Sequence, residues 1–519
     1  MCKNHDHGKK LISDLHSHCG AEFTFGKKSY AGSVNDDVDT AQCRKRYEST
    51  GDSQALLALG DALAHQMRYN EAIVCYKKLC ELCPDDYIAH RKLAVRYLSV
   101  LDLDGAEREF DWCAQRTQDR LDVDYLRAIT SFCKGDYCEA IKILEGCYAL
   151  CKDNGEMYVA VLYWHIQCLV KSGRKAEIAL EHCFKGLDGG HHVGYMRTVE
   201  LFLSGDDGNI TPCSDELNEC IFRYGQCAYY QNKGDYVKAA KLRDSALALD
   251  TYFSCFAYLG AFCESRAGNN ALASIKEFFA MHSKVALAYS GGVDSALLLY
   301  LAAACGAEVK AYCVRSQFQP YFETDDAIRL ASDISCECRL IDIDILKNAS
   351  VTVNAKDRCY HCKKNILDEI AACARSDGFD TVIDGTNADD DLNERAGARA
   401  LKEAGTLSPL RLCGFTKLMI RELSQKYGLF TFDKPSYSCL ATRVAAGTVL
   451  SAELLKKIEN AEAYLFDLGY KNFRVRVDGQ SAKIEIDGRQ EEKFKTEQDK
   501  IFKNLAQYFD CVSKSEITR

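Results

Sequence analysis

The chain has 519 residues and a net charge of −9, with 47% hydrophobic and 27% charged residues. That length exceeds one ordinary domain and predicts about three folding units, and the composition excludes a disordered or fibrous chain. No apolar run approaches the ~20 residues of a membrane-crossing helix. The acidic balance argues against general binding to duplex nucleic acid.

Residues 1–51 predict a polar, partly disordered leader. The opening text MCKNHDHGKKLISDLHSHCG has no apolar segment of the kind that a secretion signal carries, so we expect a cytoplasmic protein. His5, His7, His16 and His18 lie among lysines and aspartates. Imidazoles are zinc ligands, so a metal site is the alternative interpretation of this segment.

The 28 cysteines are scattered through predicted helices. They do not form the compact disulfide framework that is typical of short secreted proteins. Most are therefore expected to be buried thiols that act as small hydrophobic residues. So many free thiols suit a reducing compartment.

Between residues 52 and 281, small residues recur at a step of 34 positions. Ala72, Ala106 and Ala140 follow this step, and an aromatic residue or leucine stands four positions after each. This period is that of tetratricopeptide repeats, and it predicts five to seven helical hairpins in a right-handed solenoid. We expect the concave face to bind a protein partner or sulfur donor. A plain spacer or dimerisation arm remains open, because stacking alone explains each periodic residue.

After Met281, short apolar runs alternate with helical stretches. The runs KVALAYS, EVKAYCV, CRLIDID and DTVIDGT are typical of buried parallel strands joined by helices. A doubly wound parallel α/β domain is therefore predicted over 282–450. A helix and two alternating runs predict a small α+β appendage over 451–519. The predicted fold class is thus α + α/β, with the helical solenoid first.

The stretch YSGGVDS places two glycines between a strand and a helix. Gly291 and Gly292 allow a tight turn, and the helix start offers N–H groups and partial positive charge to an anion. Ser290 and Ser295 flank the turn, and Asp294 is a candidate Mg²⁺ ligand. We predict that these five residues bind the phosphates of a nucleotide. No G-x-x-x-x-G-K-[ST] is present, so this is not a Walker A loop.

The same stretch resembles the PP-loop signature SGGxDS of ATP pyrophosphatases. This resemblance implies an adenine nucleotide alpha hydrolase-like fold, activation of an oxygen by adenylation, and release of pyrophosphate. Asp384 and Asn387 follow a later predicted strand, on the side where such sheets bind ligands, and are further candidates for ATP binding. The acidic run Asp389, Asp390 and Asp391 either adds a Mg²⁺ ligand or forms a solvated turn.

Arginines are candidates for binding the phosphate and carboxylate groups of a nucleotide substrate, because guanidinium pairs with both in a bidentate manner. For Arg474 and Arg476, an exposed strand face is an equally good interpretation. The five candidates are Arg395, Arg399, Arg443, Arg474 and Arg476.

Five further motifs between Lys284 and Asp487 resemble, in order, those of the LarE family, the ATP-dependent sulfurtransferases of nickel-pincer nucleotide biosynthesis. The motifs are NAKDRCYHCKKNILDEI, VIDGTNADDDLNERAGARALKEAGTLSPL, KLMIREL, DKPSYSCLATR and RVRVDGQSAKIEID. The resemblance implies a pyridinium dicarboxylate mononucleotide whose carboxylate is adenylated and then attacked by sulfur. It also makes a homo-oligomer plausible. Two departures concern substrate binding: Glu394 to Gly397 replace the family's tyrosine, arginine, proline and glycine, and Asp478 replaces a histidine.

In LarE-type enzymes the cysteine of the CLATR stretch, here Cys439, is the sulfur centre. Some members sacrifice it, whereas others add a C-x-x-C pair and hold a [4Fe-4S] cluster on three thiolates. Cys359 and Cys362 supply that pair here. The resemblance therefore implies a catalytic cluster on Cys359, Cys362 and Cys439, with one iron open to carry a transferable sulfide. Whether Cys439 is sacrificial or a cluster ligand stays open.

Other uses of these thiols remain. A zinc site with Cys413 as fourth ligand fits the C-x-x-C spacing, and a redox disulfide needs one thiol of low pKa. The neighbouring bases Arg358, Lys363 and Lys364 are expected to favour thiolate over thiol.

The sequence thus predicts an ATP-dependent, Mg²⁺-dependent and iron–sulfur-dependent enzyme. A tRNA thiolase is the nearest enzymatic alternative, although no RNA-binding module or basic arm is evident. The other alternative is a scaffold in which the solenoid is the working part and the C-terminal half is not catalytic.

Overall fold

The computed structural model describes residues 23–25, 28–30, 35–206, 213–249, 255–391, 396–435 and 437–516. Contacts divide the chain into two compact units, residues 1–268 and 269–519, and the boundary falls within helix α14, Phe256–Met281. The sequence placed this boundary at the end of the same helix, because helical periodicity continues to Met281. Among the described residues, no helix is long and apolar enough to cross a membrane.

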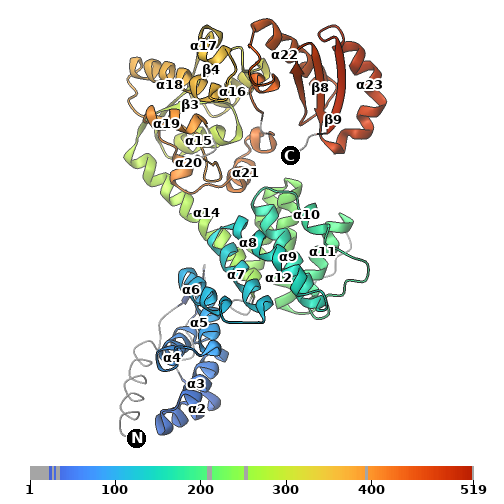
Figure 1. The fold of residues 1–519 in the computed structure, drawn as a ribbon. Helices are drawn as coiled ribbons and strands as arrows, with labels where there is room; N and C mark the ends of the chain where they lie inside the picture. The colour runs from blue at the N-terminus through green and yellow to red at the C-terminus, as the bar shows by residue number, and fades with distance from the viewer. Residues whose placement is uncertain are drawn as a thin grey trace. The chain divides into compact units, whose positions relative to one another are not determined.

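The first unit consists mainly of helices in which consecutive members pack on one another (Figure 1). A short antiparallel pair of strands, β1 and β2, comes before them. Their bounds are β1 Phe23–Phe25, β2 Lys28–Tyr30, α2 Val38–Thr50, α3 Ser53–His65, α4 Tyr69–Leu82, α5 Tyr87–Ser99, α6 Leu103–Ala114, α7 Arg120–Lys134, α8 Tyr137–Leu150, α9 Gly155–Lys171, α10 Glu177–Leu180, α11 Val193–Ser204, α12 Glu216–Lys233 and α13 Tyr236–Leu247.

Helix α2 lies within the predicted leader, residues 1–51, which was expected to be polar and partly disordered. Asp37 caps the start of the helix by accepting a hydrogen bond from the Thr40 N–H, and Gly51 ends it at φ 62°. Tyr47 of α2 is buried, and Arg44 pairs with Asp36. The helix was missed because few apolar residues anchor it. The four N-terminal histidines lie outside the described residues.

The 34-residue step is confirmed by the packing. Ala72, Ala106 and Ala140 are fully buried, each in the second helix of a pair: α3–α4, α5–α6 and α7–α8. Small residues allow the paired helices to approach closely. At Gly60 of α3, an added Cβ would lie 2.7 Å from the ring of Tyr76 on α4.

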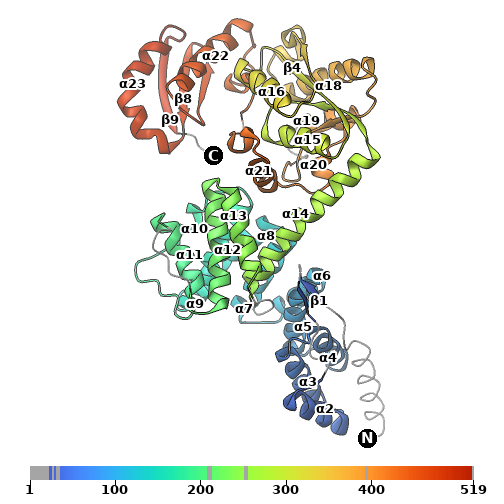
Figure 2. The same cartoon turned by 180° about the vertical axis from the view of Figure 1, so that it is seen from behind.

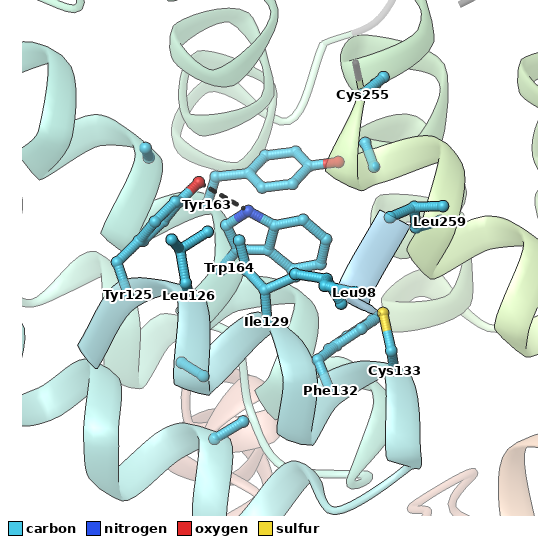
Figure 3. Close-up of a cluster of buried hydrophobic side chains, with 14 of the residues drawn as sticks. Leu98, Tyr125, Leu126, Ile129, Phe132, Cys133, Tyr163, Trp164, Cys255 and Leu259 are labelled. Atoms are coloured by element: carbon cyan, nitrogen blue, oxygen red, sulfur yellow. Dashed lines mark hydrogen bonds between the residues drawn. The ribbon is translucent and has the colours of Figure 1, made fainter. Parts of the chain in front are cut away.

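Later helices of the unit share one continuous core with these pairs. In Figure 3, Trp164 of α9 lies among side chains of α7 and α14, and its indole N–H donates to the hydroxyl of Tyr125 over 3.1 Å. Phe132 packs edge-on against the same indole. The buried N–H of the tryptophan thus has its partner inside the core.

A buried carboxylate, Glu264 of α14, joins four helices in this unit. It accepts hydrogen bonds from Lys171 at 2.6 Å and from Gln231 and Tyr224 at 2.8 and 2.9 Å, and Arg243 lies 3.2 Å away. Burial raises the pKa of Glu264, but the charges of Lys171 and Arg243 outweigh burial and lower it to about 2. The carboxylate is therefore ionised inside the core.

The second unit is built around a four-stranded parallel sheet of order β5-β4-β3-β6. Its chain leaves β3 for β4 and β5 and then returns to the other side of β3, which is the doubly wound pattern that the sequence predicted. The elements are β3 Lys284–Ala288, α15 Val293–Ala304, β4 Glu308–Arg315, α16 Tyr321–Asp333, β5 Cys338–Asp342, α17 Ala349–Thr352, α18 Arg358–Ser376, β6 Val382–Asp384, α19 Ala396–Glu403, α20 Pro409–Leu412 and α21 Lys417–Lys426.

Helices cover both faces of this sheet. Val285 and Leu287 of β3 point into a core with α15, α16 and α21, whereas Ala286 between them points into a core with α18. This alternation explains why the strands are apolar on both faces. The strands therefore end together at one carboxyl edge, which carries the loops described below.

A second sheet, β7-β8-β9, follows the short helix η4, Leu440–Arg443. Helices α22 and α23 lie beside it (Figure 2) and share one core with its three strands. The same core includes Phe318 and Val351 of the parallel-sheet region, so the appendage packs against that region. The bounds are α22 Ala452–Asp467, β7 Arg474–Asp478, β8 Ser481–Ile486, α23 Glu491–Leu505 and β9 Cys511–Glu516.

Candidate active site

The glycine loop after β3 forms a compact turn before α15. Gly291 has φ +70°, and a Cβ there would lie 2.7 Å from that of Ala327, so only glycine fits. The hydroxyls of Ser290 and Ser295 lie 3.1 Å apart, and Ser295 donates to the Gly292 carbonyl. The serines thus fix the turn, and Gly292 leads into the start of α15. This geometry suits a phosphate group.

A second loop, after β6, meets the first. A Cβ on Gly385 would lie 2.8 Å from the backbone nitrogen of Ser295, so the two loops are in close contact. Asp384 is buried and accepts hydrogen bonds from the hydroxyls of Thr386 and Ser408, each at 2.7 Å. Asn387, also buried, donates to Asp294 over 3.3 Å. The predicted ATP residues of the two loops therefore lie together at the point where strand order reverses, between β3 and β6.

Lys417, at the start of α21, completes this group. Its ammonium nitrogen lies 2.6 and 2.8 Å from the two carboxylate oxygens of Asp294, and its backbone N–H donates to Asp389 over 2.6 Å. Lys417 is the first residue of the KLMIREL motif, but the sequence did not indicate a role for this lysine. Lys417 lies far from the glycine loop in sequence, and no local pattern reveals that contact.

In the acidic run after Asn387, two side chains accept hydrogen bonds from nearby backbone N–H groups. Asp389 accepts the Lys417 N–H, and Asp390 accepts the Asn387 N–H at 3.0 Å. Burial raises the pKa of Asp389, and the Lys417 N–H opposes this. Asp391 is exposed. Asp294, the predicted Mg²⁺ ligand, has both carboxylate oxygens in contact with Lys417.

The three predicted thiols come from two elements. Cys359 and Cys362 lie in the first turns of α18, and Cys439 caps the start of η4. Arg358 connects the two elements, because it donates to the Ala441 carbonyl over 2.9 Å and contacts the Cys359 sulfur at 3.6 Å. Cys362 and Cys439 also pack against the same core. The fold thus brings together residues that are about 80 positions apart.

Thiolate is not the favoured form of Cys362 and Cys439, which corrects the expectation from the neighbouring bases. Burial raises the pKa of Cys362 to about 12, and the nearby Cys439 and Cys359 raise it further. Burial also raises the pKa of Cys439, and Arg358 only partly opposes it. The cations act in the expected direction, but the loss of water around the sulfur is the larger effect.

The thiol group and the phosphate loop are connected through α18. Lys363, directly after Cys362, places its ammonium nitrogen 3.8 Å from a carboxylate oxygen of Asp384. Asp384 is the last residue of β6, beside the loop that contacts Ser295. This contact links the helix that bears two of the thiols to the strand that carries the candidate ATP loop.

Comparisons with known proteins agree with this arrangement. Residues 60–99 match the TPR repeat family. The chain is 31% identical over 205 residues to the pyridinium-3,5-bisthiocarboxylic acid mononucleotide synthase of Lactiplantibacillus plantarum, which covers 39% of this chain and 74% of that enzyme. The chain belongs to the LarE family of PP-loop sulfurtransferases. The matched length fits the second unit, which carries the motifs.

Two further relatives are similar to this chain over part of its length. An uncharacterized protein of Synechocystis is 36% identical over 224 residues, which is 43% of this chain and 84% of the relative. The tRNA-specific 2-thiouridylase MnmA of Thermotoga maritima is 27% identical over 144 residues, 23% of this chain and 40% of that enzyme. LarE and MnmA relatives are ATP-dependent PP-loop enzymes that use Mg²⁺, so this function is supported at the level of the family.

Arg443, predicted to bind substrate, is placed differently from the expectation. Its side chain is 1% exposed and pairs with Glu462 of α22 at 2.7 Å, beside the ring of Tyr437. Glu462 also accepts the Val475 N–H at 2.9 Å. Arg443 therefore joins η4 to the α+β appendage. Because its guanidinium is buried and paired, we do not expect it to contact a substrate phosphate directly.

The other predicted arginines are dispersed. Arg399 stacks 3.5 Å from the ring of Tyr360, on the thiol-bearing helix. Arg476 pairs with Glu485 at 2.7 Å on the exposed side of β7, and Arg474 is buried in the same strand. Arg395 lies outside the described residues. Of this set, Arg399 and Arg476 keep accessible guanidinium groups.

The side chains near the three thiols fit the zinc and iron–sulfur hypotheses differently. In the described part of the chain, no three His, Cys, Asp or Glu side chains are arranged to share one metal ion. Cys413 packs against the core of α15 and not against that of Cys362 and Cys439, so the structure does not assemble the proposed zinc set. A [4Fe-4S] cluster asks for something different, because each thiolate binds a different iron. Three neighbouring thiols fit that requirement.

Proposed function

We propose that this LarE-family chain adenylates a carboxylate of a pyridinium dicarboxylate mononucleotide and replaces AMP with sulfur, for biosynthesis of the nickel-pincer nucleotide cofactor. The observation that supports the proposal is the contact between Lys363 and Asp384, which links the thiol-bearing helix α18 to the strand that carries the candidate ATP loop. Activation of the carboxylate and delivery of sulfur can then occur at one edge of the sheet.

In the first step, a carboxylate oxygen of the substrate attacks the α-phosphorus of ATP and pyrophosphate leaves. The glycine loop and the start of α15 would hold the phosphates, and Asp294 would hold Mg²⁺, which neutralises charge on pyrophosphate. Lys417 pairs with Asp294 at 2.6 Å and is positioned to bind a phosphate oxygen. Two cationic groups would then stabilise the charge that develops as pyrophosphate leaves.

In the second step, a sulfur nucleophile attacks the acyl carbon, the bond to AMP breaks, and a thiocarboxylate remains. Cys359, Cys362 and Cys439 would hold a [4Fe-4S] cluster, whose open iron supplies a transferable sulfide when the cluster is bound. The high pKa of Cys362 means that this thiol would lose its proton on binding metal. The chain's own part is to hold the three thiols on two neighbouring elements, with Cys362 and Cys439 partly buried and Cys359 exposed.

The experiment measures pyrophosphate release by the full chain, purified without oxygen, with ATP, Mg²⁺ and pyridinium-3,5-dicarboxylate mononucleotide. Bulk tRNA replaces the mononucleotide in a parallel reaction. We expect release that depends on the mononucleotide and falls about a hundredfold or more in Asp294→Asn. Asp391→Asn, a neighbouring exposed carboxylate, is the matched control. Release that depends on tRNA, or no release with either substrate, would overturn the proposed reaction.

A second measurement tests the cluster separately. Iron and acid-labile sulfide near about four each per chain, both lost in the Cys359/Cys362/Cys439→Ala variant, are expected. Zinc, or no metal, would overturn the cluster and leave Cys439 as a sacrificial donor. Pyrophosphate release should persist in this variant, because the thiols do not touch the phosphate loop.

A further inference from the structure

Two polar side chains that precede the C-x-x-C pair bind the main chain around η4, the short helix that Cys439 caps. The guanidinium of Arg358 donates to the Ala441 carbonyl over 2.9 Å. The amide of Asn354 donates to the Ala445 carbonyl over 2.8 Å. These two residues stand one and five positions before the first cysteine of the pair. The two thiol-bearing elements are therefore joined by side chains directly beside the thiols.

Asn354 has a backbone conformation that few residues adopt. Its φ is +53°, in the left-handed region, where asparagine is far commoner than most other non-glycine residues. The residue is 1% exposed. Its amide oxygen accepts a hydrogen bond from the Arg358 guanidinium, and its amide nitrogen donates to Ala445. Asparagine fits this position because it tolerates the backbone and offers both an acceptor and a donor. Asn354 thus links Arg358 to the segment that follows Cys439.

The packing of the appendage against the parallel-sheet region has other support. The backbone N–H groups of Gly447 and Leu450 donate to the carbonyls of Asn354 and Thr352 over 2.9 and 2.8 Å. Apolar residues of the parallel-sheet region also lie in the core of the appendage. These contacts do not involve the side chains of Asn354 or Arg358. Packing of the appendage alone therefore does not account for a buried amide and a buried guanidinium at this place.

We propose that Asn354 and Arg358 are positioning residues that fix the separation of Cys439 from the C-x-x-C pair, so that the three thiols act as one ligand set. Arg358 contacts both sides, because its guanidinium also lies 3.6 Å from the Cys359 sulfur. Ligands that come from two separate elements need partners that hold those elements at a fixed distance. This inference rests on the proposed function, since it assigns the two side chains to the thiols of that reaction.

The probe is arsenite, added to the full chain after its metal is removed and its thiols are reduced. Arsenite condenses with three thiols to a tris-thiolate and releases water, so its Kd reports how well three thiols meet. The test variants are Asn354→Gly, which keeps the left-handed backbone and loses the amide, and Arg358→Lys, which keeps the charge and loses the planar fork. The matched controls are Asn348→Asp, which keeps the cap of α17, and Arg375→Lys, in the last turn of α18.

The wild-type chain should bind arsenite about tenfold or more tightly than Cys439→Ala, which lacks the third thiol. The Kd should rise about tenfold or more in both test variants and less than about twofold in the controls. Asn354→Asp, which keeps the acceptor for Arg358, should restore part of the lost affinity. Thermal melts verify that each variant folds.

Kd values equal to that of the wild-type chain in both test variants would overturn the proposal, and so would equal Kd values for the wild-type chain and Cys439→Ala. A wild-type chain that releases no pyrophosphate, or holds no iron, would instead overturn the proposed reaction or its cluster. The arsenite comparison uses the metal-free chain and no substrate, so the two failures are distinguishable.

Discussion

Burial raises the pKa of cysteine thiols in both units, but the surroundings of those thiols differ. In the solenoid, Cys75 and Cys168 belong to one continuous apolar core, and burial raises the pKa of Cys75 to about 12. In the second unit, Cys362 and Cys439 lie at the edge of a core, where Arg358 connects their two elements. A raised thiol pKa therefore accompanies plain packing in one unit and, in the other, two thiols whose elements Arg358 connects. Only the neighbours distinguish the two.

The largest expected effect tests this distinction directly. Cys439→Ala should lower formation of the thiocarboxylate product, measured by mass spectrometry, about a hundredfold or more, because it removes one of three gathered sulfurs. Pyrophosphate release should stay within about threefold of the wild-type rate, since Asp294 and the glycine loop are untouched.

Cys168→Ala is the matched control, because that thiol is fully buried in the solenoid. It should leave product formation within twofold and lower the free energy of unfolding by about 1–2 kcal/mol through lost packing. If both variants lose product formation equally, the two groups of thiols do not differ in function.

The second prediction tests whether the phosphate-binding residues and the thiols act separately. Lys417→Met removes the ammonium group that lies 2.6 Å from Asp294. We expect kcat/KM for pyrophosphate release to fall about 10–100-fold, because a group that stabilises the leaving phosphate is lost. Iron content should not change, since Lys417 belongs to the phosphate end. Lys426→Met, in the last turn of the same helix, is the control. Loss of iron in Lys417→Met would contradict this division.

Local sequence predicted the parts of the molecule that depend on local spacing. The 34-residue step of Ala72, Ala106 and Ala140 predicted the helical pairs, and SGGVDS predicted the turn before α15. The order of the motifs also predicted that the stretch with Cys359 and Cys362 and the stretch with Cys439 act together. These features need only a periodic pattern or a short run of residues to specify them.

Features that depend on distant contacts escaped prediction. The pairing of Lys417 with Asp294 joins residues 123 positions apart. The burial of Arg443 against Glu462 follows from how the appendage docks, and an arginine in a motif gives no sign of it. The thiol pKa values were misjudged for a related reason, since sequence neighbours reveal nearby charge but not the loss of water.

A third prediction compares two buried carboxylates, one in each unit. Glu264→Gln removes the carboxylate that pairs with Lys171 and Arg243 in the solenoid core, and Glu462→Gln removes the one that pairs with Arg443 in the second unit. Each should cost about 3–5 kcal/mol, because an unpaired buried charge remains. Urea unfolding followed by tryptophan fluorescence reports the solenoid, where Trp112 and Trp164 lie. That signal should shift in Glu264→Gln and stay unchanged in Glu462→Gln. A shift of equal size in both variants would mean that the units unfold together.

The smallest effect is on the pH dependence of stability. The pKa of Glu264 is about 2 in the folded chain, below the ordinary value of 4.5, so its stabilising contribution is complete above pH 4.5 and is lost as pH falls toward 2. At pH 3 the loss should be about 2 kcal/mol, measured as a shift in the urea midpoint between pH 7 and pH 3. Glu264→Gln should remove this part of the pH dependence.

Asp377 in the second unit provides the contrast. Hydrogen bonds from Lys310 and Arg339 hold its pKa well below the ordinary value, but this carboxylate lies at the surface. Salt screens exposed charges far more than buried ones. The pH dependence that Glu264 causes should therefore persist at 1 M salt, whereas the contribution of Asp377 should shrink. If added salt removes both, Glu264 is accessible to ions and its ion pairs are not sealed within the solenoid core.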